Sequence, residues 1–239
     1  MAVMMPFLAE QRRATHAGGL RREEVLACVV RELKRAQGSF SPDVFLVQID
    51  TAPAVLKDYS RRGVLGRLWG RYVTWREMRA LCMVGDLDGV PRFLARVGTC
   101  GILMEFVEGE LLPRRNVRAS VSIEFFERAQ ELLGRIHSRG VAHGDVRRKN
   151  LIIRPNGSPA IIDFQTAWLA GRGFFSGAMF RYMCCVDTWN LLKIKAKSFP
   201  RKLRPEERAA LEAPPRLLGF GRRLRRWLSR RSRVRRSKA

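Results

Sequence analysis

Two short apolar runs joined by a tight turn constrain the fold of this chain most strongly. Residues 151–153 and 160–163 are separated by RPNGSP, whose Asn-Gly pair suits a hairpin. A hairpin returns the chain to its starting point, so Asn150 and Asp163, at its two ends, should lie close together. Asp145 precedes Asn150 by five residues and should lie at the mouth of the same loop. The sequence therefore predicts three polar side chains at one end of a hairpin.

These three side chains suit phosphoryl transfer. The amide oxygen of Asn150 and the carboxylate of Asp163 are hard ligands of the kind that Mg²⁺ prefers. Asp145 is then free to orient a hydroxyl nucleophile, and such reactions are catalysed mainly by positioning and charge neutralisation. The alternative is a charged surface loop that precedes a buried hairpin. The order of motifs elsewhere in the chain favours the chemical interpretation.

The remaining pattern predicts an α+β fold. With 46% hydrophobic residues among 239, the chain can bury a substantial core. Apolar spacing predicts helices at residues 22–36, 73–84 and 122–138 and again beyond Asp163, and strands at 44–49, 54–57 and 101–106 as well as the hairpin. We therefore expect a small antiparallel sheet that carries one long helix, followed by a compact and mainly helical part.

The central motif resembles the catalytic loop of protein kinases. His143, Asp145 and Asn150 match the pattern H-x-D-x-x-x-x-N, and Asp163-Phe164 matches the start of the metal-binding D-F-G. The resemblance implies a two-lobed protein-kinase-like fold with Mg²⁺ and ATP between the lobes. It also implies that Asn150 and Asp163 hold the metal, that Asp145 is catalytic and that His143 supports the loop.

Upstream motifs follow the same order. AVLK resembles the strand whose lysine holds the α and β phosphates, which gives Lys57, and WREMRAL resembles the helix whose glutamate pairs with that lysine, which gives Glu77. Taken alone, Lys57 could be a surface lysine and Glu77 a residue of a solvated helix face. The shared order of the motifs assigns both to the nucleotide site.

Two more motifs complete the resemblance. ILMEFVEG is similar to the hinge, where Met104 would be the gatekeeper and Glu105 to Val107 would offer backbone groups to adenine. Asp187 resembles the buried aspartate that braces the catalytic loop, although it could simply cap a helix.

The resemblance predicts four parts in the chain. They are an N-terminal helical extension (1–37), an N-lobe (38–107), a C-lobe (108–200) and a basic amphipathic tail (201–239).

Departures from the protein-kinase pattern narrow the resemblance. Gly144 replaces the common arginine, Gln165 replaces the D-F-G glycine, and only twenty-three residues lie between Asp163 and Asp187, without an A-P-E. QGSFSPD has one glycine where a glycine-rich loop is expected. The chain is therefore more similar to bacterial lipopolysaccharide (Kdo or heptose) kinases and RIO-type atypical kinases. That likeness implies a membrane glycolipid sugar or a protein serine as acceptor.

The charge of the chain predicts an anionic partner. The formal net charge is +24, and residues 201–239 carry fifteen Lys or Arg against three Glu. Within residues 217–238, Phe220, Leu224, Trp227 and Leu228 share one helical face, which suits the surface of an anionic membrane. Nucleic acid is the second interpretation and a solvated tail the third.

The sequence as a whole predicts a kinase that uses Mg²⁺ and ATP. The first acceptor expected is a sugar hydroxyl of a lipopolysaccharide-type glycolipid, with the protein cytoplasmic and peripheral on the inner membrane face. The second interpretation is a RIO-like serine/threonine protein kinase, and the third is an inactive nucleotide-binding module that docks on membrane or nucleic acid. Arg147, Arg148 and Lys149 could contact the transferred phosphate or an anionic acceptor.

Overall fold

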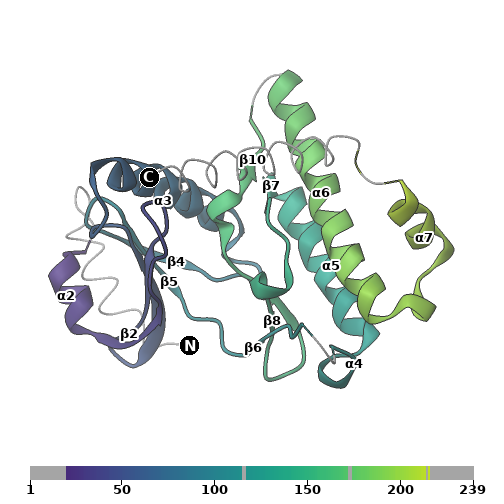
Figure 1. Cartoon of the computed structure of the whole chain (residues 1–239), viewed down its shortest axis with the longest axis horizontal. Helices are drawn as coiled ribbons and strands as arrows, with labels where there is room; N and C mark the ends of the chain where they lie inside the picture. Colours follow the sequence, from purple (N-terminus) through teal and green to yellow (C-terminus); the bar gives the residue numbers. More distant parts are fainter. Residues whose placement is uncertain (1–19, 115–116, 172–173, 214, 216–239) are drawn as a thin grey trace, which may run out of the picture.

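A five-stranded antiparallel sheet forms one lobe of the computed structural model, which describes residues 20–114, 117–171, 174–213 and 215. The strands run in the order β1-β2-β3-β5-β4 (Figure 1). They span Val29–Lys34 (β1), Asp43–Ile49 (β2), Ala52–Asp58 (β3), Phe93–Val97 (β4) and Gly101–Glu105 (β5). The hairpin predicted from residues 44 to 57 and the strand predicted at 101–106 are confirmed, whereas β4 was not predicted.

Helix α3 (Val64–Val84) packs against this sheet. Its buried side includes Val73, Ala80 and Leu81. The helix begins nine residues before the predicted start at residue 73. Its early turns approach Tyr59 so closely that a Cβ on Gly70 would lie 2.5 Å from the Tyr59 Cβ, and therefore only glycine fits there.

The helix predicted at residues 22–36 is wrong beyond its first turns. Helix α2 (Arg22–Ala27) ends early, and the chain continues as β1, which pairs with β2. The apolar spacing of this segment suits a helix, but the paired edge of β2 gives its backbone groups partners in the sheet. The sheet therefore begins at residue 29, inside the segment predicted as a helical extension.

The second lobe is mainly helical. Its helices are α4 (Val117–Ser120), α5 (Ile123–Ser138), α6 (Phe174–Ser198) and α7 (Pro205–Glu212), with 3-10 turns η1 (Arg148–Asn150), η2 (Phe164–Thr166) and η3 (Pro200–Lys202). Its short strands are β6 (Glu110–Leu111), β7 (Val141–Ala142), β8 (Leu151–Ile153), β9 (Pro159–Ile161) and β10 (Trp168–Leu169). Strands β8 and β9 form the predicted hairpin. The α+β class is confirmed.

One hydrophobic core joins the two lobes. The same buried cluster contains Leu81 and Ile102 from the sheet lobe and Phe126, Leu151 and Phe164 from the helical lobe. The loops that carry the predicted site residues therefore lie on a shared packed base.

Several predictions fall outside the described residues. These include the amphipathic face in residues 217–238, most of the basic tail and the first nineteen residues of the predicted N-terminal extension. In the part of the chain that the structure describes, no helix combines the length and the apolar character needed to cross a bilayer.

Candidate active site

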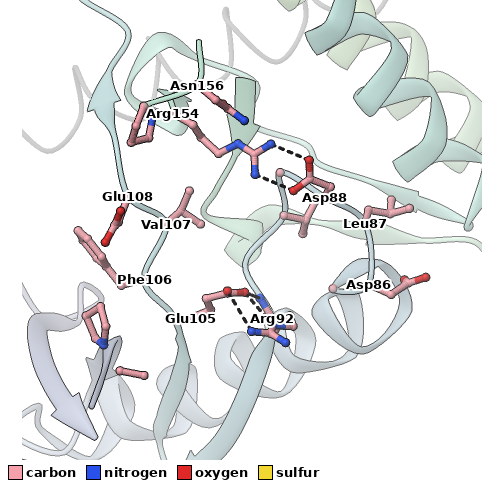
Figure 2. A pocket seen from close by; sticks show the side chains of 16 residues that line it. Asp86, Leu87, Asp88, Arg92, Glu105, Phe106, Val107, Glu108, Arg154 and Asn156 are labelled. Carbon is pink, nitrogen blue, oxygen red and sulfur yellow. Dashed lines mark hydrogen bonds and ion pairs between the residues drawn. The ribbon is translucent and has the colours of Figure 1, made fainter. Parts of the chain in front are cut away.

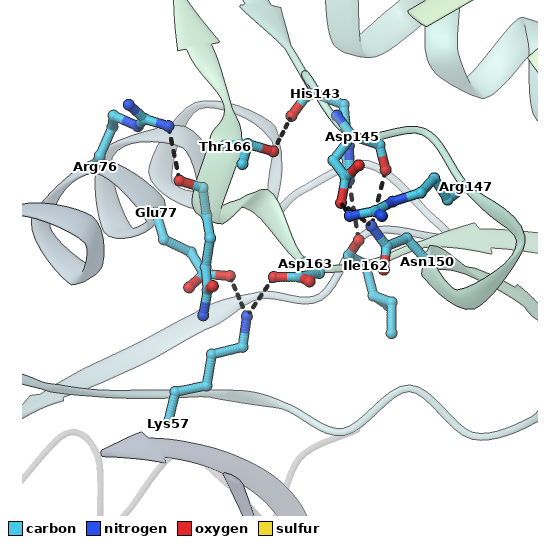
Figure 3. A network of polar contacts seen from close by, with 11 residues as sticks. Lys57, Arg76, Glu77, His143, Asp145, Arg147, Asn150, Ile162, Asp163 and Thr166 are labelled. Carbon is cyan, nitrogen blue, oxygen red and sulfur yellow. Dashed lines mark hydrogen bonds and ion pairs between the residues drawn. The ribbon is translucent and has the colours of Figure 1, made fainter. Parts of the chain in front are cut away.

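Three charged side chains from distant segments meet between the lobes (Figure 3). Lys57 comes from β3, Glu77 from α3 and Asp163 from the turn after β9. Lys57 Nζ lies 2.7 Å from Glu77 Oε1 and 2.9 Å from Asp163 Oδ1. Lys57 and Glu77 are buried, so neither is the surface residue that the sequence left open.

The charged groups in this network shift one another's pKa values. Burial lowers the pKa of Lys57, but the two carboxylates outweigh that effect and raise it above its ordinary value. Burial likewise raises the pKa of Asp163, but the Lys57 ammonium reverses the shift and lowers it to about 2. For Glu77, burial dominates and raises the pKa. Lys57 and Asp163 therefore hold opposite charges at neutral pH.

Asp163 adopts a strained backbone conformation. Its φ is 73° and its ψ is 68°, in the left-handed region that side chains other than glycine rarely adopt. Such strain costs about 1–3 kcal/mol and persists where surrounding contacts enforce it. Here the next residue, Phe164, is fully buried and its ring packs edge-on against His143 with centroids 4.8 Å apart. Packing of Phe164 therefore holds the carboxylate beside Lys57.

The loop between β7 and β8 presents Asp145 and Asn150 next to this network (Figure 3). Asn150 Nδ2 donates to the Asp145 carbonyl oxygen at 2.8 Å, and Ile162 N donates to the Asn150 carbonyl oxygen at 3.0 Å. The second bond fixes the loop against the segment that leads into Asp163. Arg147 forms an ion pair with the Asp145 carboxylate. This pair was not predicted, because two residues with such spacing in a loop can point in any direction.

The atoms of Asn150 and Asp163 fit a magnesium ion. The Asn150 amide nitrogen is bonded to Asp145, and Asp163 Oδ1 is bonded to Lys57. The remaining oxygen of each side chain is the donor available to a metal. An amide oxygen and a carboxylate oxygen form a hard donor set, which suits Mg²⁺ with water and phosphate oxygens completing its shell.

Asp187, in α6, holds the loop between β7 and β8 through hydrogen bonds to its backbone. Its fully buried carboxylate accepts hydrogen bonds from the backbone N–H of His143 at 2.6 Å and of Gly144 at 2.9 Å. The side chain thus binds the loop and does not cap its own helix. His143 is also buried, and its Nε2 lies 2.9 Å from the Ile162 carbonyl oxygen. His137, in α5, also lies beside this carboxylate, with its Nε2 3.3 Å from Asp187 Oδ2.

The backbone geometry at position 144 requires glycine. Its φ is 78°, and a Cβ there would lie 2.4 Å from the Thr166 carbonyl oxygen. Thr166 Oγ1 in turn donates to the His143 carbonyl oxygen at 3.2 Å. The loop therefore packs directly on η2, and the arginine of the protein-kinase pattern could not occupy this position without moving it.

The predicted hinge follows β5. Met104 is buried in the shared core. The backbone N–H of Glu105 donates to the Arg92 carbonyl oxygen at 2.9 Å, so only the Glu105 carbonyl could accept from adenine at this residue. The Glu105 side chain pairs with Arg92 instead of pointing toward Lys57. Val107 lies just beyond the end of the strand.

A cavity of about 760 Å³ lies along the hinge (Figure 2). The residues that line it include Asp86, Asp88, Glu105, Val107 and Arg154. Lys57, Asp145 and Asp163 are not among its lining residues. The cavity is bordered by the α3–β4 loop and the β8–β9 hairpin and shares Glu105 and Val107 with the predicted hinge.

Comparison with known proteins gives a local likeness. No family model matches the sequence. The chain is 39% identical over 80 residues to a probable bifunctional tRNA threonylcarbamoyladenosine biosynthesis protein of Methanoculleus marisnigri. The aligned stretch is 33% of this chain and 14% of that protein. The chain thus matches a small part of its relative. This match does not show which family the chain belongs to, so its membership of a kinase family remains a prediction.

Proposed function

We propose that this protein is an ATP-dependent phosphotransferase. The observation that carries the proposal is the buried network in which Lys57 contacts both Glu77 and Asp163. A buried lysine held by two carboxylates is a fixed cation, and a fixed cation beside metal ligands suits the phosphates of a nucleotide. The order of these residues along the chain is also that of the kinases it resembles.

Each residue has a distinct part in the proposed reaction. Lys57 neutralises the nucleotide phosphates and Glu77 holds the ammonium in place. Asn150 and Asp163 would hold Mg²⁺, which neutralises charge on the phosphates when bound. Asp145 orients the acceptor hydroxyl and receives its proton. The acceptor oxygen forms a bond to the γ-phosphorus, the bond to the bridging oxygen breaks, and ADP leaves.

The surroundings of the loop favour an anionic acceptor. A cavity of about 430 Å³ is lined by Arg114, Arg118, Arg148 and Lys197, and its described lining residues include no carboxylate. Arg148 belongs to the same loop as Asp145 and donates to the Arg114 carbonyl oxygen at 3.0 Å. Guanidinium groups suit phosphate and carboxylate groups. A phosphorylated or carboxylated sugar could therefore bind here.

We propose a sugar hydroxyl of an acidic, lipopolysaccharide-type glycolipid at the inner membrane face as the first acceptor. The cationic cavity supports it. So does the short connection between Asp163 and α6, whose described residues include only η2 and β10 as regular elements and give little platform for an extended peptide.

A protein serine or threonine is the second candidate. The likeness to the tRNA threonylcarbamoyladenosine biosynthesis protein favours it, because that match lies outside lipid chemistry. In this version the same site works as an atypical protein kinase.

Transfer of a radiolabelled γ-phosphate tests both the phosphotransfer activity and the identity of the acceptor. Purified protein, labelled ATP and Mg²⁺ are incubated with a membrane extract, and the lipid and protein fractions are counted separately. Label in lipid supports the first acceptor, and label in protein supports the second. The matched control is Asp163→Asn, which keeps the shape of the side chain but removes its charge. If ATP binds but no label is transferred to either fraction, the proposal of an enzyme is refuted. The protein would then be an inactive nucleotide-binding module.

A further inference from the structure

One face of α3 exposes an unusual amount of apolar surface. Seven of the twelve large hydrophobic side chains that are exposed in the described part of the chain gather there, with exposed fractions between 42% and 73%. We call this set the α3 ridge: Phe40, Val64, Leu65, Leu68, Trp69, Tyr72 and Trp75. Contiguous apolar surface of this kind marks an interaction site in a protein that folds normally.

The ridge is a preformed surface. Phe40 and Trp69 have ring centroids 6.1 Å apart, Trp69 and Tyr72 are 5.9 Å apart, and Tyr72 and Trp75 are 6.5 Å apart. The rings therefore form a continuous row along the helix. The opposite side of α3, which includes Glu77, packs into the protein. The row therefore lies on the side of α3 that faces away from the protein core.

The charged side chains on the exposed side of α3 are all positive. Helix α3 contains Arg67, Arg71, Arg76 and Arg79, and its single acidic residue is Glu77, which is fully buried. Two of these arginines lie over ridge rings, with the Arg76 guanidinium carbon 5.5 Å from the Tyr72 centroid and that of Arg79 5.0 Å from the Trp75 centroid. The outer surface of α3 therefore combines aromatic and aliphatic groups with positive charge alone.

We propose that the α3 ridge docks on an anionic lipid surface. Tryptophan and tyrosine favour the boundary between headgroups and acyl chains, leucine and valine favour the acyl chains, and arginine attracts anionic headgroups. A nucleic acid would explain the arginines but gains little from Val64, Leu65 and Leu68. A second copy of the chain would set the same four arginines against one another across a twofold axis. The arginine-rich residues 216–239 would meet the same repulsion.

This inference does not rest on the proposed phosphotransfer, and it differs from the membrane contact predicted for residues 217–238. It assigns the docking surface to the sheet lobe. It also places the contact on the helix that carries Glu77, two residues beyond Trp75.

Sedimentation with vesicles tests the proposal on the full chain. Wild type is compared with Leu65→Ser/Trp69→Ser/Trp75→Ser, using vesicles of phosphatidylcholine with phosphatidylglycerol and vesicles of phosphatidylcholine alone. We expect wild type to prefer the anionic vesicles and the triple variant to bind them at least about tenfold more weakly. The matched control is Val30→Ser/Leu33→Ser, which removes exposed apolar side chains from β1 and should bind as wild type does. Unchanged thermal melting and ATP binding of the triple variant establish that it is folded.

Fluorescence identifies which surface enters the lipid. Brominated anionic lipids should quench wild-type tryptophan emission, and Trp69→Phe/Trp75→Phe should lose that quenching while it still sediments. Equal binding by wild type and the triple serine variant would overturn the proposal. So would quenching that persists in the phenylalanine variant, since it would come from another tryptophan. If Trp69 and Trp75 are shielded from acrylamide without vesicles, another part of the chain covers the ridge, and the proposal fails. If wild type self-associates and the serine variant does not, the ridge binds a second copy, and the proposal fails as well.

Discussion

The Lys57–Glu77 ion pair and the Asp145–Arg147 pair lie in one site but differ in their access to water. The side chains of Lys57 and Glu77 are 9% and 1% exposed, whereas those of Asp145 and Arg147 are 22% and 51% exposed. Asp163, which also contacts Lys57, is 29% exposed and lies at the boundary between the two pairs. The first pair is held by packing from both lobes, and its charges cannot be separated without leaving an ion buried. The second lies on a loop surface where solvent can replace either partner. The half of the site that we assign to the nucleotide is therefore fixed, and the half that we assign to the acceptor is open.

Lys57→Met should have the largest effect of any single change in the site. It removes the cation and leaves the buried Glu77 carboxylate beside the partly exposed carboxylate of Asp163, so we expect a loss of about 3–5 kcal/mol in the free energy of unfolding. Phosphotransfer should fall by about a thousandfold, because the fixed cation on the phosphates is gone. Denaturant unfolding and the labelling assay measure the two effects. A stable Lys57→Met protein would show that the network is not the tightly coupled unit described above.

Asp145→Asn should separate activity from stability. Its side chain is partly exposed and its backbone contacts survive the change, so the free energy of unfolding should stay within about 0.5 kcal/mol of wild type. Transfer should fall by about a hundredfold or more, because the acceptor proton loses its base. ATP binding, measured by calorimetry, should be unchanged. A comparable loss of ATP affinity would place Asp145 with the nucleotide and break the division between the two halves.

The buried half should also give the protein an acid-sensitive stability. The pKa of Asp163 is lowered from 3.8 to about 2, so its ionised form contributes stability above pH 4 that is lost as the pH falls through the folded value. The contribution is about 1–2 kcal/mol. The raised pKa of Glu77 acts in the opposite direction, since protonation on acidification favours the folded state.

Comparison of wild type with Asp163→Asn measures this contribution together with its effect on Glu77, because the Asp163 charge also raises the pKa of Glu77. The difference in the free energy of unfolding should shrink between pH 5 and pH 2. A difference that is constant over this range would mean that Asp163 is not held by Lys57 in solution.

Arg147→Ser should have the smallest effect. Half-exposed ion pairs contribute at most about 1 kcal/mol, so the free energy of unfolding should barely change. The acceptor KM should respond more than the ATP KM if the arginine lies on the open side of the site. Arg139→Ser, which removes an exposed arginine that pairs with Asp86 outside this loop, is the matched control. A rise in the ATP KM for Arg147→Ser alone would assign this arginine to the nucleotide side.

The sequence predicted the polar centre better than the elements that carry it. Asp145, Asn150 and Asp163 could be placed together because every hairpin brings its two ends close to one another, and this reasoning needs no knowledge of distant packing. The strand β1 was missed because its apolar residues have helical spacing, while its pairing with β2 depends on residues ten to eighteen positions further along the chain.

Helix α3 was predicted too short for a related reason. Its first turns contain Gly66 and Gly70 and carry their apolar side chains outward, so they lack the buried apolar stripe that indicates a helix. The contact of His137 with Asp187 joins residues fifty positions apart, and no local pattern predicts it. Local reasoning thus failed where a backbone segment or side chain has its partner in another element.

The pairing of Arg154 with Asp88 bears on how the two lobes can move. Two bonds of 2.6 Å connect the β8–β9 hairpin to the α3–β4 loop, and Ile161 N donates to the Gly89 carbonyl oxygen at 2.8 Å beside them (Figure 2). Asp88 is largely exposed, so the pair adds little energy, but a bidentate contact fixes direction as well as distance. The lobes cannot slide past one another along this edge without breaking it. Together with the hydrophobic core that the lobes share, these contacts fix how the hairpin lies against the loop.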